Sequence, residues 1–253
     1  MSINPVGDVL RGECSWALAR GDYREALASV EMVDALITDP PYGARTHAGH
    51  DSGVERVENH KHGDTKTSRA RRRLHYSCWT RDDVWQFVEF WSPRVRGWFG
   101  AMSCSDLAGV WREAFEYHGR VAFAPVACVI RAMSVRLSGD GPSNWVVYLN
   151  LARPKGLIDG TRNGAYVVNR DAGHIGGKPP RLMDAIVRDY SRPGDLICDP
   201  CAGLGTTLHS AIALGRRAIG AELDPATHAA AIASLRRGGF QGDMFAAHVL
   251  EAP

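Results

Sequence analysis

The stretch from Asp195 to Pro225 constrains the fold more than any other part of the chain. It reads DLICDPCAGLGTTLHSAIALGRRAIGAELDP. An apolar run at Leu196–Cys198 precedes a turn with two glycines, and the pattern then predicts a helix over Thr206–Leu214 and a strand over Arg217–Glu222. This order predicts one strand–helix–strand unit, which forms half of a nucleotide-binding fold.

The glycine turn in this unit has features of a cofactor site. Gly203 and Gly205 let the backbone pass close to a ligand, and the following helix begins with unpaired N–H groups. Glu222 ends the second strand, where a carboxylate can accept hydrogen bonds from both hydroxyls of a ribose. The turn lacks the full Gly-x-Gly-x-x-Gly pattern and a phosphate-binding Lys, and Asp199 suits a charged amine better than a pyrophosphate. We therefore expect a cofactor with an amine and no phosphate, which is S-adenosylmethionine. A glycine-rich turn that binds no cofactor is the alternative.

A second motif, DALITDPPYG, runs from Asp34 to Gly43. Its apolar first half predicts a strand that delivers Asp39, Pro40, Pro41 and Tyr42 to the carboxyl edge of a sheet. The two prolines fix φ and remove two N–H donors, which leaves a stiff turn. The Asp39 side chain and the Pro40 carbonyl can accept both hydrogens of an exocyclic amine, while Tyr42 offers a face on which a base stacks. A purely structural Asp-Pro turn is the alternative.

Together, DPPYG and DPCAGLGTT resemble the amino-methyltransferases of DNA, which methylate adenine N6 or cytosine N4 with S-adenosylmethionine. The order, catalytic motif first and cofactor motif last, is similar to that of their beta group. The resemblance runs from about Gly21 to Pro225. It implies an α/β, Rossmann-like methyltransferase fold with permuted motif order: a seven-stranded, mostly parallel sheet with an antiparallel edge strand, in one domain over residues 1–253.

The resemblance also implies roles for individual residues. Asp22 would lie near the adenine of the cofactor, and HIGGKP before the helix expected over Pro180–Tyr190 is similar to the family's HPTQKP, which lines the methionine end. His174, Lys178 and Pro179 match that segment, whereas its middle three residues do not. The expected catalytic residues are Asp39, Pro40, Pro41 and Tyr42. The expected cofactor-binding residues are Asp22, Lys178, Asp199, Pro200, Ala202, Gly203, Gly205, Thr206, Thr207 and Glu222.

Residues 44–77 are the least core-like part of the chain. Their low apolar content predicts a flexible loop, and their basic character favours contact with DNA phosphates. The candidates for DNA contact are Arg45, Lys61, Lys66, Arg71, Arg72 and Arg73. A solvated loop is the alternative, and the histidines of this segment match no recognisable metal-site pattern. Residues 153–173 are short, polar and irregular, and the target-recognition region of the resembled family lies about here. We therefore expect a reduced target-recognition region, with readout of sequence by the loops at 44–77 and 134–143.

The remaining elements follow from apolar spacing. Residues 1–11 have little pattern and predict a surface arm. Helices are expected over 23–30, 82–91 and 106–118, and strands over 16–20, 97–104, 121–130 and 145–151.

Composition limits the size of the core, the binding of polyanions and the cellular compartment that we expect for the protein. With 253 residues, 45% of them hydrophobic, the chain can bury one substantial core. The net charge of +2 makes the molecule as a whole only mildly basic, so a site for a polyanion must be a local basic patch. Neither a signal-like start nor a long apolar span is present in the sequence, so we expect a cytoplasmic protein without membrane contact. Six cysteines fit a reducing compartment, and Cys198 and Cys201 are interpreted as packing residues and not as metal ligands.

The activity expected from these features is site-specific methylation of adenine N6 in double-stranded DNA, with the base rotated out of the helix. An Asp-first turn favours adenine, because cytosine-N4 enzymes of the resembled family more often begin with Ser. The alternatives are an N4-cytosine enzyme, a methyltransferase acting on RNA, protein or a small molecule, a silent DNA-binding relative and a dinucleotide-dependent enzyme. A homodimer and a cognate restriction nuclease stay open as partners.

Overall fold

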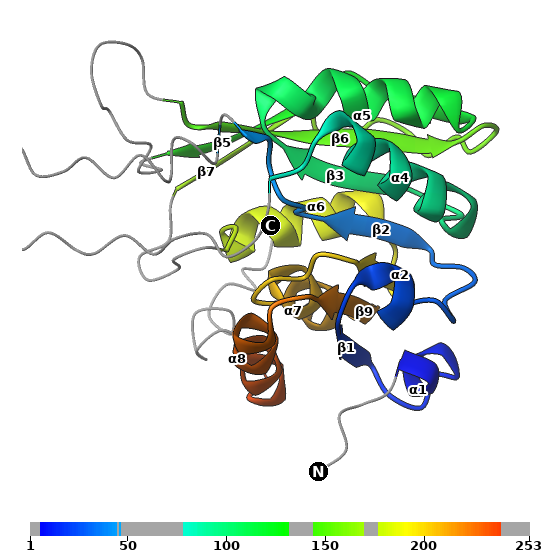
Figure 1. Ribbon diagram of the computed structural model, residues 1–253, viewed down its shortest axis with the longest axis vertical. Helices are drawn as coiled ribbons and strands as arrows, with labels where there is room; N and C mark the ends of the chain where they lie inside the picture. Colours follow the sequence, from blue (N-terminus) through cyan, green and yellow to red (C-terminus); the bar gives the residue numbers. More distant parts are fainter. Residues whose placement is uncertain (1–5, 45, 47–77, 132–143, 170–176, 239–253) are drawn as a thin grey trace, which may run out of the picture.

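The centre of the protein is a mixed β-sheet, seen in a computed structural model that describes residues 6–44, 46, 78–131, 144–169 and 177–238 (Figure 1). The nine strands of the sheet run in the order β1-β9-β8-β2-β3-β6-β5-β7, with β4 also paired to β6. Their bounds are β1 Trp16–Arg20, β2 Ala35–Thr38, β3 Phe99–Ser103, β4 Arg120–Ala122, β5 Val126–Arg131, β6 Val146–Pro154, β7 Ala165–Asn169, β8 Leu196–Asp199 and β9 Arg217–Glu222.

Strand direction decides where the polar motifs meet. The five strands from β1 to β3 are parallel, while β6 is antiparallel to its neighbours β3 and β5. The carboxyl ends of β1, β9, β8, β2 and β3 therefore share one edge of the sheet. The predicted α/β class with a mostly parallel sheet is confirmed. The antiparallel pairs, β3 with β6 and β6 with β5, lie near the edge of the sheet that β7 forms. Among the described residues the sheet has nine strands and not seven, because β4 and β7 add to it.

Helices cover both faces of this sheet (Figure 1). One face packs against α1 (Val6–Leu10), α2 (Tyr23–Ala26), α4 (Arg81–Trp91), the short 3-10 helix η1 (Ser92–Arg94) and α5 (Ser105–Tyr117). The other packs against α6 (Pro180–Tyr190), α7 (Thr206–Ala213) and α8 (Pro225–Arg236). The chain thus forms three layers with an apolar core on each side of the sheet.

Local sequence explains several helix boundaries. Thr80 and Asp83 form a capping box at the start of α4, and Pro180 occupies the first position of α6. Val84, Phe87, Val88 and Trp91 of α4 are all buried. Phe99 of β3 and Phe115 of α5 meet with ring centroids 4.9 Å apart. Aromatic burial therefore holds α4 and α5 on the sheet.

Four local expectations were wrong. The expected N-terminal arm contains α1, because Val9 is fully buried and its carbonyl accepts a hydrogen bond from Arg217 at 2.8 Å. The helix predicted over residues 23–30 is α2, which ends at Ala26. The strand predicted over 121–130 is two strands, since β4 and β5 each pair with β6.

The fourth concerns the segment at 153–173, which was expected to be irregular. It contains β7, paired in parallel with β5. This edge strand exposes Val167 at 55% but buries Tyr166, so one of its faces packs on the core.

Candidate active site

The two motifs lie on adjacent strands at the carboxyl edge of the sheet. Leu36 of β2 pairs in parallel with Cys198 of β8, so both strands deliver their turns side by side. The Thr38 hydroxyl donates a hydrogen bond to Asp199 Oδ1 at 2.7 Å, between residues 161 positions apart in sequence. The catalytic turn and the glycine turn therefore share one corner of the molecule.

The glycine turn has a backbone that few other residues adopt. Gly203 has φ 54° and Gly205 has φ 80°, both in the left-handed region. A Cβ placed on Gly203 would meet nothing within 4 Å among the described atoms, so this side of the turn is open. No side chain caps the first turn of α7, which begins at Thr206. Within the turn itself, the N–H groups of Cys201, Ala202, Gly203 and Gly205 bond to protein oxygens. The uncapped start of α7 is therefore the part that can offer N–H groups to a ligand.

Glu222 is anchored at the end of β9 beside this turn. Its Oε2 accepts from Gly203 N at 2.8 Å and its Oε1 accepts from Asp224 N at 2.8 Å. Each carboxylate oxygen has a further lone pair, so Glu222 can still accept from two hydroxyls. The carboxylate has the fixed position that a ribose diol needs.

Asp22 lies next to Glu222 through the pairing of β1 with β9. Gly21 N donates to the Glu222 carbonyl at 3.0 Å, and Asp22 caps α2 through Arg24 N at 2.9 Å. Leu223, the next residue after Glu222, exposes 65% of its surface. Two acids and an exposed apolar side chain at one strand edge suit a ligand with a ribose and a flat ring.

Asp199 is placed differently from these residues. Only 2% of it is exposed, and its Oδ1 also accepts from Cys201 N at 3.2 Å. Burial raises the pKa of Asp199 to about 6, while hydrogen bonds with Thr207 and Thr38 oppose that rise. Its carboxylate has little surface for a ligand and instead joins the two motifs.

The catalytic turn forms a compact polar group. Tyr42 Oη donates to Asp39 Oδ1 at 3.0 Å, and Lys178 Nζ donates to Asp39 Oδ2 at 2.5 Å. The same ammonium lies 4.9 Å from the centroid of the Tyr42 ring. Burial raises the pKa of Tyr42 well above its ordinary value, so its hydroxyl remains a donor. Lys178, expected at the methionine end of the cofactor, contacts the catalytic turn.

The other expected cofactor residues lie around the glycine turn and the start of α7. Thr206 and Thr207 are buried at 7% and 2% exposure, and Ala202 N donates to the Ala221 carbonyl at 2.9 Å. Pro200 is also buried, as is Pro40 in the catalytic turn, whereas Pro41 is half-buried.

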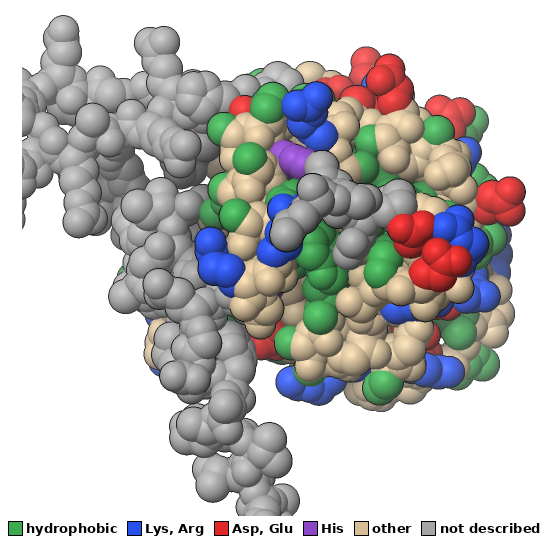
Figure 2. Space-filling view, turned by 90° about the horizontal axis from the view of Figure 1, so that it is seen from below, with side chains coloured by type: hydrophobic (Ala, Val, Ile, Leu, Met, Phe, Trp, Pro, Cys, Tyr) green, Lys and Arg blue, Asp and Glu red, His purple; other side chains and the backbone are tan. Residues whose placement is uncertain are grey.

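The six candidates for DNA contact, Arg45, Lys61, Lys66, Arg71, Arg72 and Arg73, lie outside the described residues, as does His174. On the face shown in Figure 2, acidic side chains gather mainly on one half, whereas Lys and Arg occur on both halves. The described part of that face therefore offers no continuous basic surface, and contact with DNA phosphates by the loop at 44–77 remains a prediction.

Two residues of the site were not predicted. Thr38 is the last residue of β2, and a hydroxyl at the end of an otherwise apolar strand is the signal that could have found it. Leu223 directly follows the acidic end of β9 and is 65% exposed, a property that no sequence pattern indicated.

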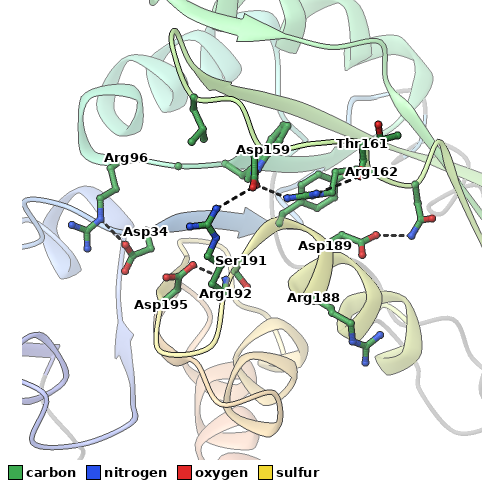
Figure 3. Close-up of a pocket in the computed structure, with 15 residues that line it drawn as sticks. Asp34, Arg96, Asp159, Thr161, Arg162, Arg188, Asp189, Ser191, Arg192 and Asp195 are labelled. Atoms are coloured by element: carbon green, nitrogen blue, oxygen red, sulfur yellow. Dashed lines mark hydrogen bonds and ion pairs between the residues drawn. The ribbon is translucent and has the colours of Figure 1, made fainter. Parts of the chain in front are cut away.

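A cavity of about 660 Å³ lies at the opposite edge of the sheet, at the amino ends of the strands (Figure 3). Its charged side chains pair with one another: Arg96 with Asp34 at 2.5 Å, and both Arg162 and Arg192 with Asp159 at 2.5 and 3.1 Å. Trp98 Nε1 also donates to Asp159 at 2.9 Å. These contacts fix residues 157–163 to the amino edge.

That placement bears on the expected target-recognition region at 153–173. Asp34 of the cavity and Asp39 of the catalytic turn stand roughly 16 Å apart along β2, at about 3.3 Å per residue. Residues 157–163 therefore face away from the catalytic turn. Within the described part of this region, β7 is the portion whose carboxyl end points to the same edge as β2.

Across residues 6–44, 46, 78–131, 144–169 and 177–238, the side chains bring together no group of three or more His, Cys, Asp or Glu that could hold a metal ion. No helix in this part of the chain combines the length and apolar character needed to cross a bilayer.

Comparison with known proteins identifies relatives. A family model described as a DNA methylase, of the N6 and N4 type, matches residues 56–233. DNA adenine methyltransferase YhdJ of Escherichia coli strain K12 is 41% identical over 59 residues, which are 23% of this chain and only 20% of that protein.

Solved structures share the fold. M1.HpyAVI in complex with SAM has a TM-score of 0.63 at 18% identity, over 85% of this chain and 97% of that one. The cytosine-N4-specific PvuII DNA methyltransferase has a TM-score of 0.60 at 15% identity, over 86% and 85% of the two chains. The matched family segment spans well over half of the sequence and includes the glycine turn, so the chain belongs to the N6/N4 DNA methylase family.

Proposed function

We propose that this protein transfers a methyl group from S-adenosylmethionine to the exocyclic N6 amine of adenine in double-stranded DNA. The observation that carries the proposal is the hydrogen bond from Thr38 to Asp199, which brings the Asp39 turn beside the glycine turn. Membership of the N6/N4 DNA methylase family supports DNA as the substrate. The SAM complex of M1.HpyAVI, which has the same fold, supports the cofactor.

The residues at the carboxyl edge fit this cofactor. Glu222 would accept from the ribose hydroxyls, and Asp22 and Leu223 would border the adenine ring. The open side of Gly203 and the uncapped start of α7 would admit the rest of the molecule. When bound, S-adenosylmethionine supplies a methyl group on a positively charged sulfur.

The catalytic turn would hold the amine of the target base. Rotating a base out of the duplex costs a few kcal/mol, which stacking and hydrogen bonds in the pocket offset. Tyr42 would stack on the base while Asp39 and the Pro40 carbonyl accept its two N–H groups. The amine nitrogen would displace the sulfonium sulfur at the methyl carbon, and the proton that it loses would pass to the Asp39 carboxylate or to solvent.

The protein accelerates this step mainly by placement. Fixing the amine in line with the methyl group removes much of the entropic cost of the encounter. The negative charge of Asp39 stabilises the positive charge that develops on the attacking nitrogen. No side chain of the protein needs to form a covalent bond with the base.

Adenine is favoured over cytosine by two points. The 59-residue match at 41% identity is to an adenine methyltransferase, and the turn begins with Asp. The N4-cytosine alternative is kept because the PvuII enzyme has the same fold. Methylation of RNA or protein is the remaining alternative, since an amine acceptor turn can serve those substrates too.

A transfer assay tests the proposal. The purified chain is incubated with S-adenosylmethionine tritiated in its methyl group and with DNA, RNA or protein, and labelled DNA is digested to nucleosides for mass spectrometry. We expect label in DNA and N6-methyldeoxyadenosine in the digest. N4-methyldeoxycytidine would support the cytosine alternative, and label confined to RNA or protein would overturn the DNA assignment.

Two variants connect the assay to the site. Asp39→Ala should lose methyl transfer while it still binds the cofactor, because the amine loses its acceptor. Asp82→Ala, which changes an exposed acid in the first turn of α4, is the matched control and should retain transfer. Full activity in Asp39→Ala would exclude the role given to the turn.

A further inference from the structure

The Lys178 ammonium lies where the proposed function places the amine of the target base. It donates to Asp39 Oδ2 at 2.5 Å, as the amine would, and it lies 4.9 Å from the centroid of the Tyr42 ring on which the base would stack. Tyr42 itself occupies Asp39 Oδ1. A described donor therefore already contacts each oxygen of Asp39.

Lys178 is held in this position by its surroundings. Its side chain is 15% exposed, whereas the cations of the other described ion pairs are 28% to 76% exposed. It directly precedes Pro179, the N-cap of α6, and that helix buries Leu182 and Met183 in the core. The contact with Asp39 is thus a built feature of the site and not a chance pairing of surface side chains.

This contact conflicts with the proposed reaction. A target amine and the Lys178 ammonium would need the same oxygen of Asp39 and the same face of Tyr42. The ion pair also cancels the negative charge that would stabilise the attacking nitrogen, and a second positive charge nearby would oppose the charge that develops there. Methyl transfer therefore requires Lys178 to leave Asp39.

We propose that Lys178 is a positioning residue that stands in for the target amine in the free protein and leaves Asp39 when the cofactor binds. The inference rests on the proposed function. The methionine end of S-adenosylmethionine carries a carboxylate, which offers the ammonium an alternative anion. The catalytic and glycine turns are neighbours, so one lysine side chain can serve both. Cofactor binding and base binding then become coupled through Lys178, each strengthening the other by the same factor.

The coupling can be measured by binding alone. The probe is a duplex that carries the methylation site found by sequencing methylated DNA, with 2-aminopurine in place of the target base. Its affinity and fluorescence are recorded without ligand, with S-adenosylhomocysteine, which keeps the carboxylate, and with 5′-methylthioadenosine, which lacks it. In the wild-type protein, S-adenosylhomocysteine should raise duplex affinity at least about fivefold, the lower end of typical coupling, and 5′-methylthioadenosine should not.

Variants at Lys178 separate this role from a purely structural one. Lys178→Met should bind the duplex and unstack 2-aminopurine without any ligand. S-adenosylhomocysteine should therefore change the duplex affinity of this variant less than about twofold, compared with at least about fivefold in the wild type. Lys178→Arg keeps the charge and should keep the coupling. Arg112→Met, which changes an exposed cation of α5 outside the site, is the control and should behave like the wild type. Thermal unfolding of each variant checks that it is folded.

Three outcomes would overturn the inference: no coupling in the wild type, equal coupling with both ligands, or coupling that persists in Lys178→Met. Failure of the proposed function gives a different result, because the wild type would then transfer no methyl group to DNA at all. A protein that methylates DNA but shows uncoupled binding would retain the function and lose only the role of Lys178.

Discussion

Replacing Thr38 with valine should weaken both the fold and the site, because Thr38 is the hydroxyl that joins the two motifs. Valine has nearly the same shape but no hydroxyl, so Asp199 Oδ1 loses its 2.7 Å donor while packing is largely kept. A hydrogen bond to a charged group contributes about 1.5–3 kcal/mol, and a buried acceptor left unpaired costs about 1–3 kcal/mol. Since Asp199 keeps its contact with Cys201 N, we expect a loss of about 1–3 kcal/mol in the free energy of unfolding.

The pH dependence of this loss follows from the raised pKa of Asp199. Its pKa is about 6 in the folded protein against an ordinary 3.8, so the folded state binds the proton more tightly than the unfolded state. The contribution of Asp199 to stability is therefore largest below about pH 4 and falls as pH rises to about 6, by about 3 kcal/mol at ~1.4 kcal/mol per pKa unit. Removing the Thr38 donor raises this pKa further, so the fall should continue above pH 6.

Urea unfolding followed by circular dichroism between pH 4 and pH 8 provides the measurement. Asp199→Asn removes the titrating group, so the difference between its curve and the wild-type curve isolates Asp199 from the other carboxylates. Thr38→Ser keeps a hydroxyl and should stay close to the wild type. Equal free energies of unfolding for Thr38→Val and the wild type at pH 8, or an equal loss at pH 4 and pH 8, would exclude the role given to the Thr38–Asp199 hydrogen bond.

Three further changes test other parts of the structure. Glu222→Gln should weaken binding of S-adenosylhomocysteine about tenfold, because a lost charged acceptor is worth about 1.4 kcal/mol. Calorimetry measures this affinity, with Glu89→Gln as the exposed control, and an unchanged affinity would remove Glu222 from the site. Tyr42→Phe keeps the ring and should lower methyl transfer far less than Tyr42→Ala, and equal losses in the transfer assay would argue against stacking. Phe115→Ala leaves a cavity against Phe99 and should cost about 3–5 kcal/mol in urea unfolding, a value near zero being inconsistent with the packing described.

Local sequence patterns determined most of the elements. Apolar spacing placed α4, α5 and α6 within about one residue of their observed ends, and it placed β8, α7 and β9 in the correct order. These patterns are informative because each element must bury one face, and the period of its apolar residues shows which face that is. The two motifs also indicated the family, because their combination and order in one chain resemble those of the DNA amino-methyltransferases.

The tertiary structure decided which side chains meet. Nothing in the sequence places Lys178 on Asp39, 139 residues away, or Thr38 on Asp199, 161 residues away. Such contacts depend on strand order and register, which arise only when distant segments pack into one sheet. The same holds for α1 and β7, whose short apolar runs fold because neighbouring strands or helices cover one side of them. Local periodicity determines an element, whereas long-range packing determines which other elements it contacts. The chemistry of the corner formed by the catalytic and glycine turns depends on those contacts.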